Sequence, residues 1–338
     1  MSSSLRAPVA SCVLVALAAI ASCSGSPPAV TPDATAPPST IPTSPAGVFS
    51  LASRLDVQVP APAAPVLAAL TAATDGPDDP ARYLVDRMIA TLPDGPVKTL
   101  AGRVAPYVAA YLNARLADIA PRFVAGVDAM ATGLSRLATH LGTIETLRID
   151  AGGNAQRTIT GLRFELGAAP IAVSFADGGL PDITVGLRVA LDATGHVKLS
   201  QHAHRLPYGA LLQLGLDRAV VLTVEPTARD LASALGKLVD CERIGGMVAE
   251  RVGLGSATLY AAACRAGMTA IASEIEAQIA AIDDSELGLD VTGAAIGVDG
   301  DGDGTMDELR SGSWSGALYS AAARAPIATA SFTGRKAP

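Results

Sequence analysis

The sequence predicts an α+β protein in which an antiparallel β-meander packs on amphipathic helices. Apolar residues recur every three or four positions over 66–142 and 226–283, and they alternate with polar residues over 143–225. The apolar fraction of 49% is large enough to build a core, although aromatic residues are only 4% of the chain. We therefore expect residues 66–338 to form one globular unit with a core of Ala, Val and Leu.

The charge balance argues against a nucleic-acid partner. The chain has 25 Lys and Arg against 32 Asp and Glu, a net charge of −7, and no Lys-rich patch that would neutralise phosphates. The sequence also contains no P-loop, no Gly-x-Gly-x-x-Gly fingerprint and no Gly-x-Ser-x-Gly motif. These absences favour a protein that is not an enzyme.

The first residues have the pattern of an export signal. A short apolar run over 12–21 follows Arg6, and it is too short to span a bilayer. The tetrad Ile20-Ala21-Ser22-Cys23 then resembles the lipobox of bacterial lipoproteins. The resemblance implies a signal peptide over 1–22 and acyl chains such as palmitate on Cys23, which hold the mature protein on a lipid bilayer. Ser24 in place of Asp favours the outer membrane. An ordinary secretory signal with an incidental Cys23 is the alternative.

Residues 23–65 are predicted to form an extended tether. Seven prolines lie among Ser, Thr, Ala and Gly over 24–47, and a second Pro-Ala patch covers 60–65. Such a composition lacks the apolar surface that folding requires. We expect no active residue in this segment.

Residues 66–142 are predicted to be helical. The clearest periodicity comes after Pro121, where apolar residues recur in steps of three and four. This spacing predicts a helix with one buried stripe: Phe123, Val127, Met130, Leu134, Leu137 and Leu141.

Residues 143–225 are predicted to form the antiparallel sheet. Strict alternation covers 183–191, shorter runs repeat it, and Gly-rich turns separate them. We also assign Val220, Leu222 and Val224 to a strand because they alternate in the same way.

Residues 226–283 are predicted to form a helical hairpin closed by a disulfide. Cys241 and Cys264 lie on the apolar faces of two helices, at similar distances from the Gly253–Gly255 turn. An antiparallel arrangement brings them together, and exported proteins meet an oxidising environment. Two separate buried thiols are the alternative.

Residues 284–338 are predicted to form a C-terminal β-hairpin with an acidic loop at its tip. Asp299, Asp301 and Asp303 alternate with glycines and resemble the first half of an EF-hand calcium loop. The last ligand position of that motif holds Arg310 instead of Glu. The resemblance implies a structural Ca²⁺ site; the alternative is a bare, solvated turn. The candidate ligands are Asp299, Asp301, Asp303, Thr305, Asp307 and Glu308.

Three histidines form a weaker candidate metal site. His196, His202 and His204 have the same parity on one predicted strand, opposite Val197 and Leu199. They are therefore expected on its polar face, where histidines at this spacing can bind Zn²⁺ or Cu²⁺. Three exposed histidines without a metal are the favoured interpretation.

Together these patterns predict an exported, lipid-anchored protein with a calcium-binding loop. A non-enzymatic role, either binding an unknown ligand or supporting an envelope protein, explains the anchor, tether, disulfide and acidic loop. A lipid or hydrophobic-ligand carrier and a hydrolase with a dispersed site are the alternatives.

Overall fold

The structure is a computed structural model that describes residues 40–72, 80–115, 121–166, 169–321 and 323–337. The predicted signal peptide, Cys23 and the first part of the predicted tether, up to residue 39, lie outside the described residues.

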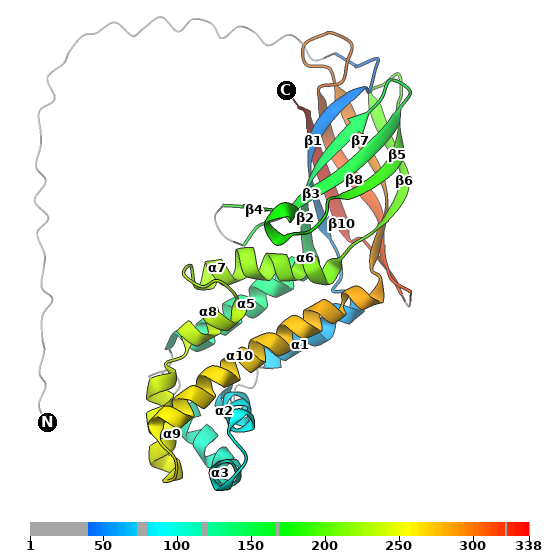
Figure 1. Cartoon of the computed structure of the whole chain (residues 1–338). Coiled ribbons are helices and arrows are strands. Elements are labelled where there is room, and N and C mark those ends of the chain that lie inside the picture. The colour runs from blue at the N-terminus through cyan, green and yellow to red at the C-terminus, as the bar shows by residue number, and fades with distance from the viewer. Residues whose placement is uncertain (1–39, 73–79, 116–120, 167–168, 322, 338) are drawn as a thin grey trace, which may run out of the picture. The chain divides into compact units, whose positions relative to one another are not determined.

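Blocks of strands and helices alternate along the described chain: β1 is followed by α1–α5, then by β2–β6, then by α6–α10 and finally by β7–β10 (Figure 1). The strands are β1 (Gly47–Asp56), β2 (His140–Ile149), β3 (Asn154–Phe164), β4 (Ile171–Ser174), β5 (Ile183–Leu191), β6 (His196–Arg205), β7 (Gly288–Val298), β8 (Glu308–Tyr319), β9 (Arg324–Pro326) and β10 (Thr329–Lys336). The helices are α1 (Ala64–Ala72), α2 (Pro80–Thr91), α3 (Pro96–Asn113), α5 (Pro121–Thr139), α6 (Tyr208–Gly215), α7 (Val221–Val224), α8 (Leu231–Leu238), α9 (Cys241–Val252) and α10 (Ala257–Ala281). A π-helical turn (Leu216–Val220) joins α6 to α7.

Eight antiparallel strands of the described chain close into a β-barrel. The order β1-β2-β3-β5-β6-β7-β8 is completed by β10, which pairs with β8 on one side and with β1 on the other. The short strands β4 and β9 pair with β3 and β8 outside this ring. Closure leaves the eight strands with partners on both sides, although β5 and β6 pair only over 189–191 and 197–199.

Alternating side chains fill the barrel interior. In β1, Phe49, Leu51, Ser53 and Leu55 are buried while Ser50 and Arg54 are exposed, as a period of two requires. The rings of Trp314 and Phe332 meet inside the barrel, with centroids 4.5 Å apart. Both side chains are buried, so they fill part of the barrel interior.

The helices pack on one another and on the barrel strands that precede and follow them. The long helix α10 contacts α2, α6, α8 and α9, and its first turn is capped by the Ser256 hydroxyl, which accepts a hydrogen bond from the Leu259 amide. The Tyr208 hydroxyl of α6 donates to the carbonyl of Ala138 near the end of α5. This contact ties the helices to the start of β2, which follows α5 directly.

The mixed helix-and-sheet class, the antiparallel pairing and the disulfide are confirmed. Cys241 is the first residue of α9 and Cys264 lies in α10, and their sulfur atoms are bonded with 5.5 Å between the Cα atoms. The predicted stripe of α5 is buried from Phe123 to Leu137, whereas Leu141 already belongs to β2.

Two predicted boundaries are wrong. The predicted tether cannot extend to residue 65, because Gly47–Asp56 forms β1 between β2 and β10. The residues Val220, Leu222 and Val224 are helical rather than extended: Val220 and its neighbours Ala219 and Val221 are all buried, whereas Leu222 is exposed, so burial does not alternate with the period of two that a strand requires. None of the described helices combines the length and the apolar character that a membrane crossing requires.

Candidate functional site

The acidic loop connects β7 to β8 and folds back on its own backbone amides. Asp299 accepts hydrogen bonds from the amides of Gly302 (2.7 Å) and Gly304 (2.9 Å), and Asp307 accepts from that of Gly300 (2.9 Å). Gly302 and Gly304 have φ of 81° and 84°, in the left-handed region that glycine tolerates. The alternation of Asp and Gly therefore lets the chain curl around its own carboxylates.

Three of the six candidate ligands converge. One carboxylate oxygen from each of Asp299, Asp301 and Asp307 lies within 4.8 Å of the other two, and this is the one such group of metal-ligating side chains among the described residues. Asp303 instead accepts from the amide and hydroxyl of Thr305. Glu308 forms ion pairs outside the group, with Arg310 at 2.5 Å and Arg335 at 3.6 Å.

Asp299 is the buried member of the acidic group and joins it to the start of the described chain. Its side chain accepts a hydrogen bond from the Thr40 hydroxyl at 2.7 Å, and the residue is only 1% exposed. This hydrogen bond, with those from the loop amides, lowers the pKa of Asp299 below its usual value. The backbone of Thr40 also pairs with that of Asp299.

A lysine competes for the same carboxylates. Lys336, near the end of β10, places its ammonium 3.3 Å from Asp307 and 2.8 Å from the Thr305 hydroxyl. Three converging carboxylates fit a hard divalent cation, and Ca²⁺ takes six to eight oxygen ligands, some of which water commonly supplies. The group can hold a metal ion, with Lys336 lowering its affinity.

The histidines do not share a face. A register shift between Leu199 and His202, where β6 pairs with β7, turns the side chains that follow it to the other side. His202 and His204 are consequently buried, whereas His196 stays exposed and lies near Asp192. The expectation that all three lie on a polar face is therefore wrong, because the bulge breaks the parity on which it depends.

A buried ion pair inside the barrel was not predicted from the sequence. Arg157 of β3 donates to Glu145 of β2 from Nε (2.6 Å) and Nη2 (2.7 Å), and neither side chain is exposed. Burial would raise the pKa of Glu145, but the Arg157 guanidinium and the Thr143 hydroxyl together hold it below its usual value. The parity of Glu145 with Leu147 and Ile149 is a sequence signal that points to this inward orientation.

The ion pair belongs to a larger polar cluster around the single tryptophan. Arg157 also donates to Nε2 of His202 (3.1 Å), and its guanidinium lies 4.4 Å from the centroid of the Trp314 ring. The indole of Trp314 donates to the Ser53 hydroxyl at 3.1 Å. Neither nitrogen of the neighbouring His204 has a hydrogen-bond partner in the described chain, although the residue is only 8% exposed. Burial, with Arg157 nearby, lowers the pKa of His204 to about 4.

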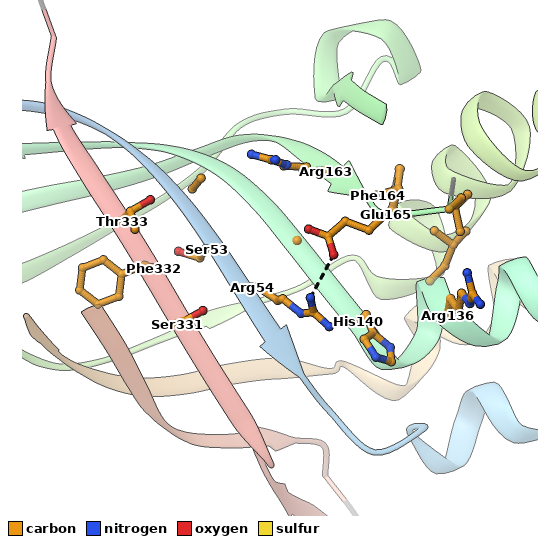
Figure 2. A pocket seen from close by; sticks show the side chains of 14 residues that line it. Ser53, Arg54, Arg136, His140, Arg163, Phe164, Glu165, Ser331, Phe332 and Thr333 are labelled. Atoms are coloured by element: carbon orange, nitrogen blue, oxygen red, sulfur yellow. Dashed lines mark hydrogen bonds and ion pairs between the residues drawn. The ribbon is translucent and has the colours of Figure 1, made fainter. Parts of the chain in front are cut away.

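A pocket of about 510 Å³ lies between residues of β1, β2, β3 and β10 and the end of α5. Exposed Arg54 of β1 and Arg163 of β3 line it, together with Arg136 of α5 and His140. Figure 2 shows Arg54 joined to Glu165, with Arg163 above this pair and His140 and Arg136 to its right. Leu137, Phe164 and Leu166 provide its apolar lining.

The chain matches no protein-family model, no curated protein and no solved structure.

Proposed function

We propose that this chain is an exported lipoprotein with a non-enzymatic binding or envelope-structural role, and that its acidic loop holds a structural Ca²⁺ ion. Acyl chains on Cys23 hold the protein on a bilayer, which we take to be the outer membrane, and residues 24–39 link this anchor to the barrel. The lipobox-like tetrad before Cys23 supports the anchor. The disulfide between Cys241 and Cys264 fits an oxidising compartment.

The observation that carries the calcium proposal is the convergence of Asp299, Asp301 and Asp307. The three charges repel one another, and a divalent cation relieves this repulsion more completely than one lysine does. Because Asp299 is bonded to Thr40, a bound ion also strengthens the attachment of the first described residues to the β7–β8 loop. The ion therefore acts at the point where the proposed tether reaches the barrel.

The barrel interior bears on the two alternative functions. A carrier needs an enclosed apolar cavity, but the centre of this barrel holds the Glu145–Arg157 pair and the rings of Trp314 and Phe332. This filling favours ligand binding on the outer surface over transport inside the barrel. A hydrolase needs a nucleophile or base that substrate can reach, and the Glu145–Arg157 pair is fully buried.

Thermal melting tests the calcium site in the full chain carrying Cys23→Ser, which removes the proposed acylation site. With a dissociation constant of ~10⁻⁴ M, 1 mM Ca²⁺ stabilises the folded state by about 1.4 kcal/mol, so the Tm rises by roughly 2–4 °C over that in chelator. Asp301→Asn should abolish this rise, whereas Asp284→Asn, which removes an exposed carboxylate elsewhere, should preserve it. An unchanged Tm with Ca²⁺ in the parent protein contradicts the proposal.

The anchor has its own test. Cells that express the full chain are labelled with radioactive palmitate, and the purified protein should carry the label. Cys23→Ser should remove it, whereas Cys12→Ser, inside the predicted signal peptide, should leave it unchanged. Unlabelled wild-type protein contradicts the lipoprotein proposal without bearing on the calcium site.

A further inference from the structure

We infer that the pocket between β1, β3 and α5 binds an amphipathic anion, that is, a carboxylate or phosphate headgroup on a single apolar chain. The inference goes beyond the proposed function, because it depends neither on the anchor nor on the calcium loop. It rests on the charges at the rim of the pocket, on its apolar lining and on its size.

The rim of the pocket is positive on a protein of net negative charge. Three arginines, Arg54, Arg136 and Arg163, line it against one acidic residue, Glu165, whereas the whole chain has a net charge of −7. Arg136 and Arg163 have no ion-pair partner among the described residues. A guanidinium offers two parallel N–H donors that match the oxygens of a carboxylate or phosphate. The two unpaired arginines are therefore the groups that would hold the headgroup.

The third arginine is already committed to other carboxylates. Arg54 donates to Glu165 at 3.0 Å and to Asp56 at 3.3 Å, and Asp56 in turn lies 3.9 Å from His140. These contacts hold the Arg54 side chain in place and neutralise its charge. Selectivity for an anion therefore rests on Arg163, which Figure 2 shows above Arg54, and on Arg136, which it shows to the right of Arg54.

The lining gives the ligand its apolar part. Leu137 and Phe164 are nearly fully buried, and Leu166 is partly buried beside them. The pocket forms where β2 and β3 approach closely: a Cβ on Gly142 would lie 2.2 Å from the carbonyl oxygen of Arg163. A volume of about 510 Å³ lies within the range of small-molecule sites, and exceeds what a bare inorganic anion needs.

Calorimetric titration of the full chain carrying Cys23→Ser tests the inference with four probes, of which the two amphipathic anions are kept below their critical micelle concentrations. Dodecanoate and dodecyl phosphate have both parts of the ligand, inorganic phosphate has only the headgroup, and dodecanol has only the chain. We expect at least one of the two amphipathic anions to bind ten times more tightly than phosphate and dodecanol. The preference between dodecanoate and dodecyl phosphate then identifies the headgroup.

Substitutions locate the binding in this pocket. Arg136→Gln and Arg163→Gln should each weaken binding about tenfold, whereas Arg148→Gln, which removes an exposed arginine from β2 outside the pocket, should change it less than twofold. Ala52→Trp and Ser331→Trp fill the pocket from two different strands, and each should abolish binding. Using both keeps the test valid if one of them fails to fold, and thermal melting identifies a misfolded variant.

The inference is overturned by no measurable binding of either amphipathic anion, by equal affinity for inorganic phosphate or dodecanol, or by binding that survives Trp substitution in a folded variant. An equal loss of affinity in Arg148→Gln also overturns it, because binding would then depend on the overall positive charge of the protein and not on this pocket. None of these results changes the calcium or palmitate experiments, so failure here is distinct from failure of the proposed function.

Discussion

Arg157 and Glu145 form a bidentate ion pair on neighbouring strands inside the barrel, with N–O distances of 2.6 and 2.7 Å and no exposure of either side chain. Desolvating two charges costs free energy that their attraction recovers only when the geometry is good and the remaining hydrogen bonds are satisfied. Here Thr143 and His202 provide such bonds. The pair therefore makes the interior sensitive to the loss of either partner.

We predict that breaking this pair destabilises the barrel strongly. Glu145→Gln and Arg157→Met should each lower the free energy of unfolding by about 3–5 kcal/mol, because each leaves an imperfectly compensated buried group. The double variant should lose less than the sum of the two single changes. Urea unfolding followed by the fluorescence of Trp314, the single tryptophan of the chain, measures all three. Additive losses would show that the two residues do not act as a pair.

Stability should fall as the pH drops below 6.5. The pKa of His204 is lowered to about 4 in the folded protein from an ordinary value of 6.5, so the unfolded chain binds the proton more readily. The free energy of unfolding begins to decrease near pH 6.5, is about 2 kcal/mol lower at pH 5, and has lost the whole His204 contribution below pH 4. His202, whose pKa burial also lowers, acts in the same direction.

Replacing His204 tests the source of this pH dependence. His204→Phe should remove most of the stability loss between pH 7 and pH 5, because the aromatic ring remains and the titratable group does not. His196→Phe changes the exposed histidine of the same strand and should leave the pH dependence as it was. Urea midpoints at pH 7, 6 and 5 measure both variants, and a parallel pH dependence in His204→Phe and the parent protein contradicts the assignment.

The disulfide should stabilise the helices. The bond links residues 23 positions apart. Closing a loop of this length lowers the conformational entropy of the unfolded chain, which stabilises the folded state by about 3 kcal/mol. The variant Cys241→Ala/Cys264→Ala should lose roughly that amount in urea unfolding. A reducing agent should lower the midpoint of the parent protein to a similar extent and leave that of the double variant unchanged.

Removing the competing lysine should strengthen calcium binding. Lys336→Met deletes the ammonium near Asp307. The repulsion between this exposed ammonium and a bound Ca²⁺ amounts to ~1 kcal/mol, so we expect the Ca²⁺ dissociation constant to fall about fivefold. Lys198→Met is the matched control, since this lysine lies on β6 and β6 does not contribute to the acidic group. Calorimetric titration with Ca²⁺ checks both, and weaker binding in Lys336→Met would contradict the role assigned to this residue.

The elements with long, regular periodicity were predictable, and the irregular ones were not. The α5 stripe from Phe123 to Leu137 follows from spacing alone. The strand β1 could not be predicted, because the prolines on both sides of it favour an extended, unpaired chain. The N-cap of α8 is Asp230, which accepts a hydrogen bond from the Ser233 amide; neither this cap nor the surfaces on which the helix packs could be identified from the sequence alone.

The candidate sites show the same division. The convergence of Asp299 and Asp301 follows from a local motif, whereas the contact of Asp299 with Thr40 spans 259 positions in the chain. One extra residue in β6 reversed the orientation of His202 and His204, because each strand position faces the side opposite to the one before it. The arginine pocket gathers residues from β1, β3 and α5, and its parts have no common sequence signal.

The barrel is closed by its first and last strands: β10 pairs along β1 and also along part of β8. Contacts between residues so far apart in the chain slow folding, because the entropy of the long intervening loop is lost before the contacts stabilise the chain. A ribosome that still holds residues 329–336 therefore holds a chain with two open strand edges. Premature termination before Thr329 should yield aggregation-prone protein rather than a slightly shortened barrel.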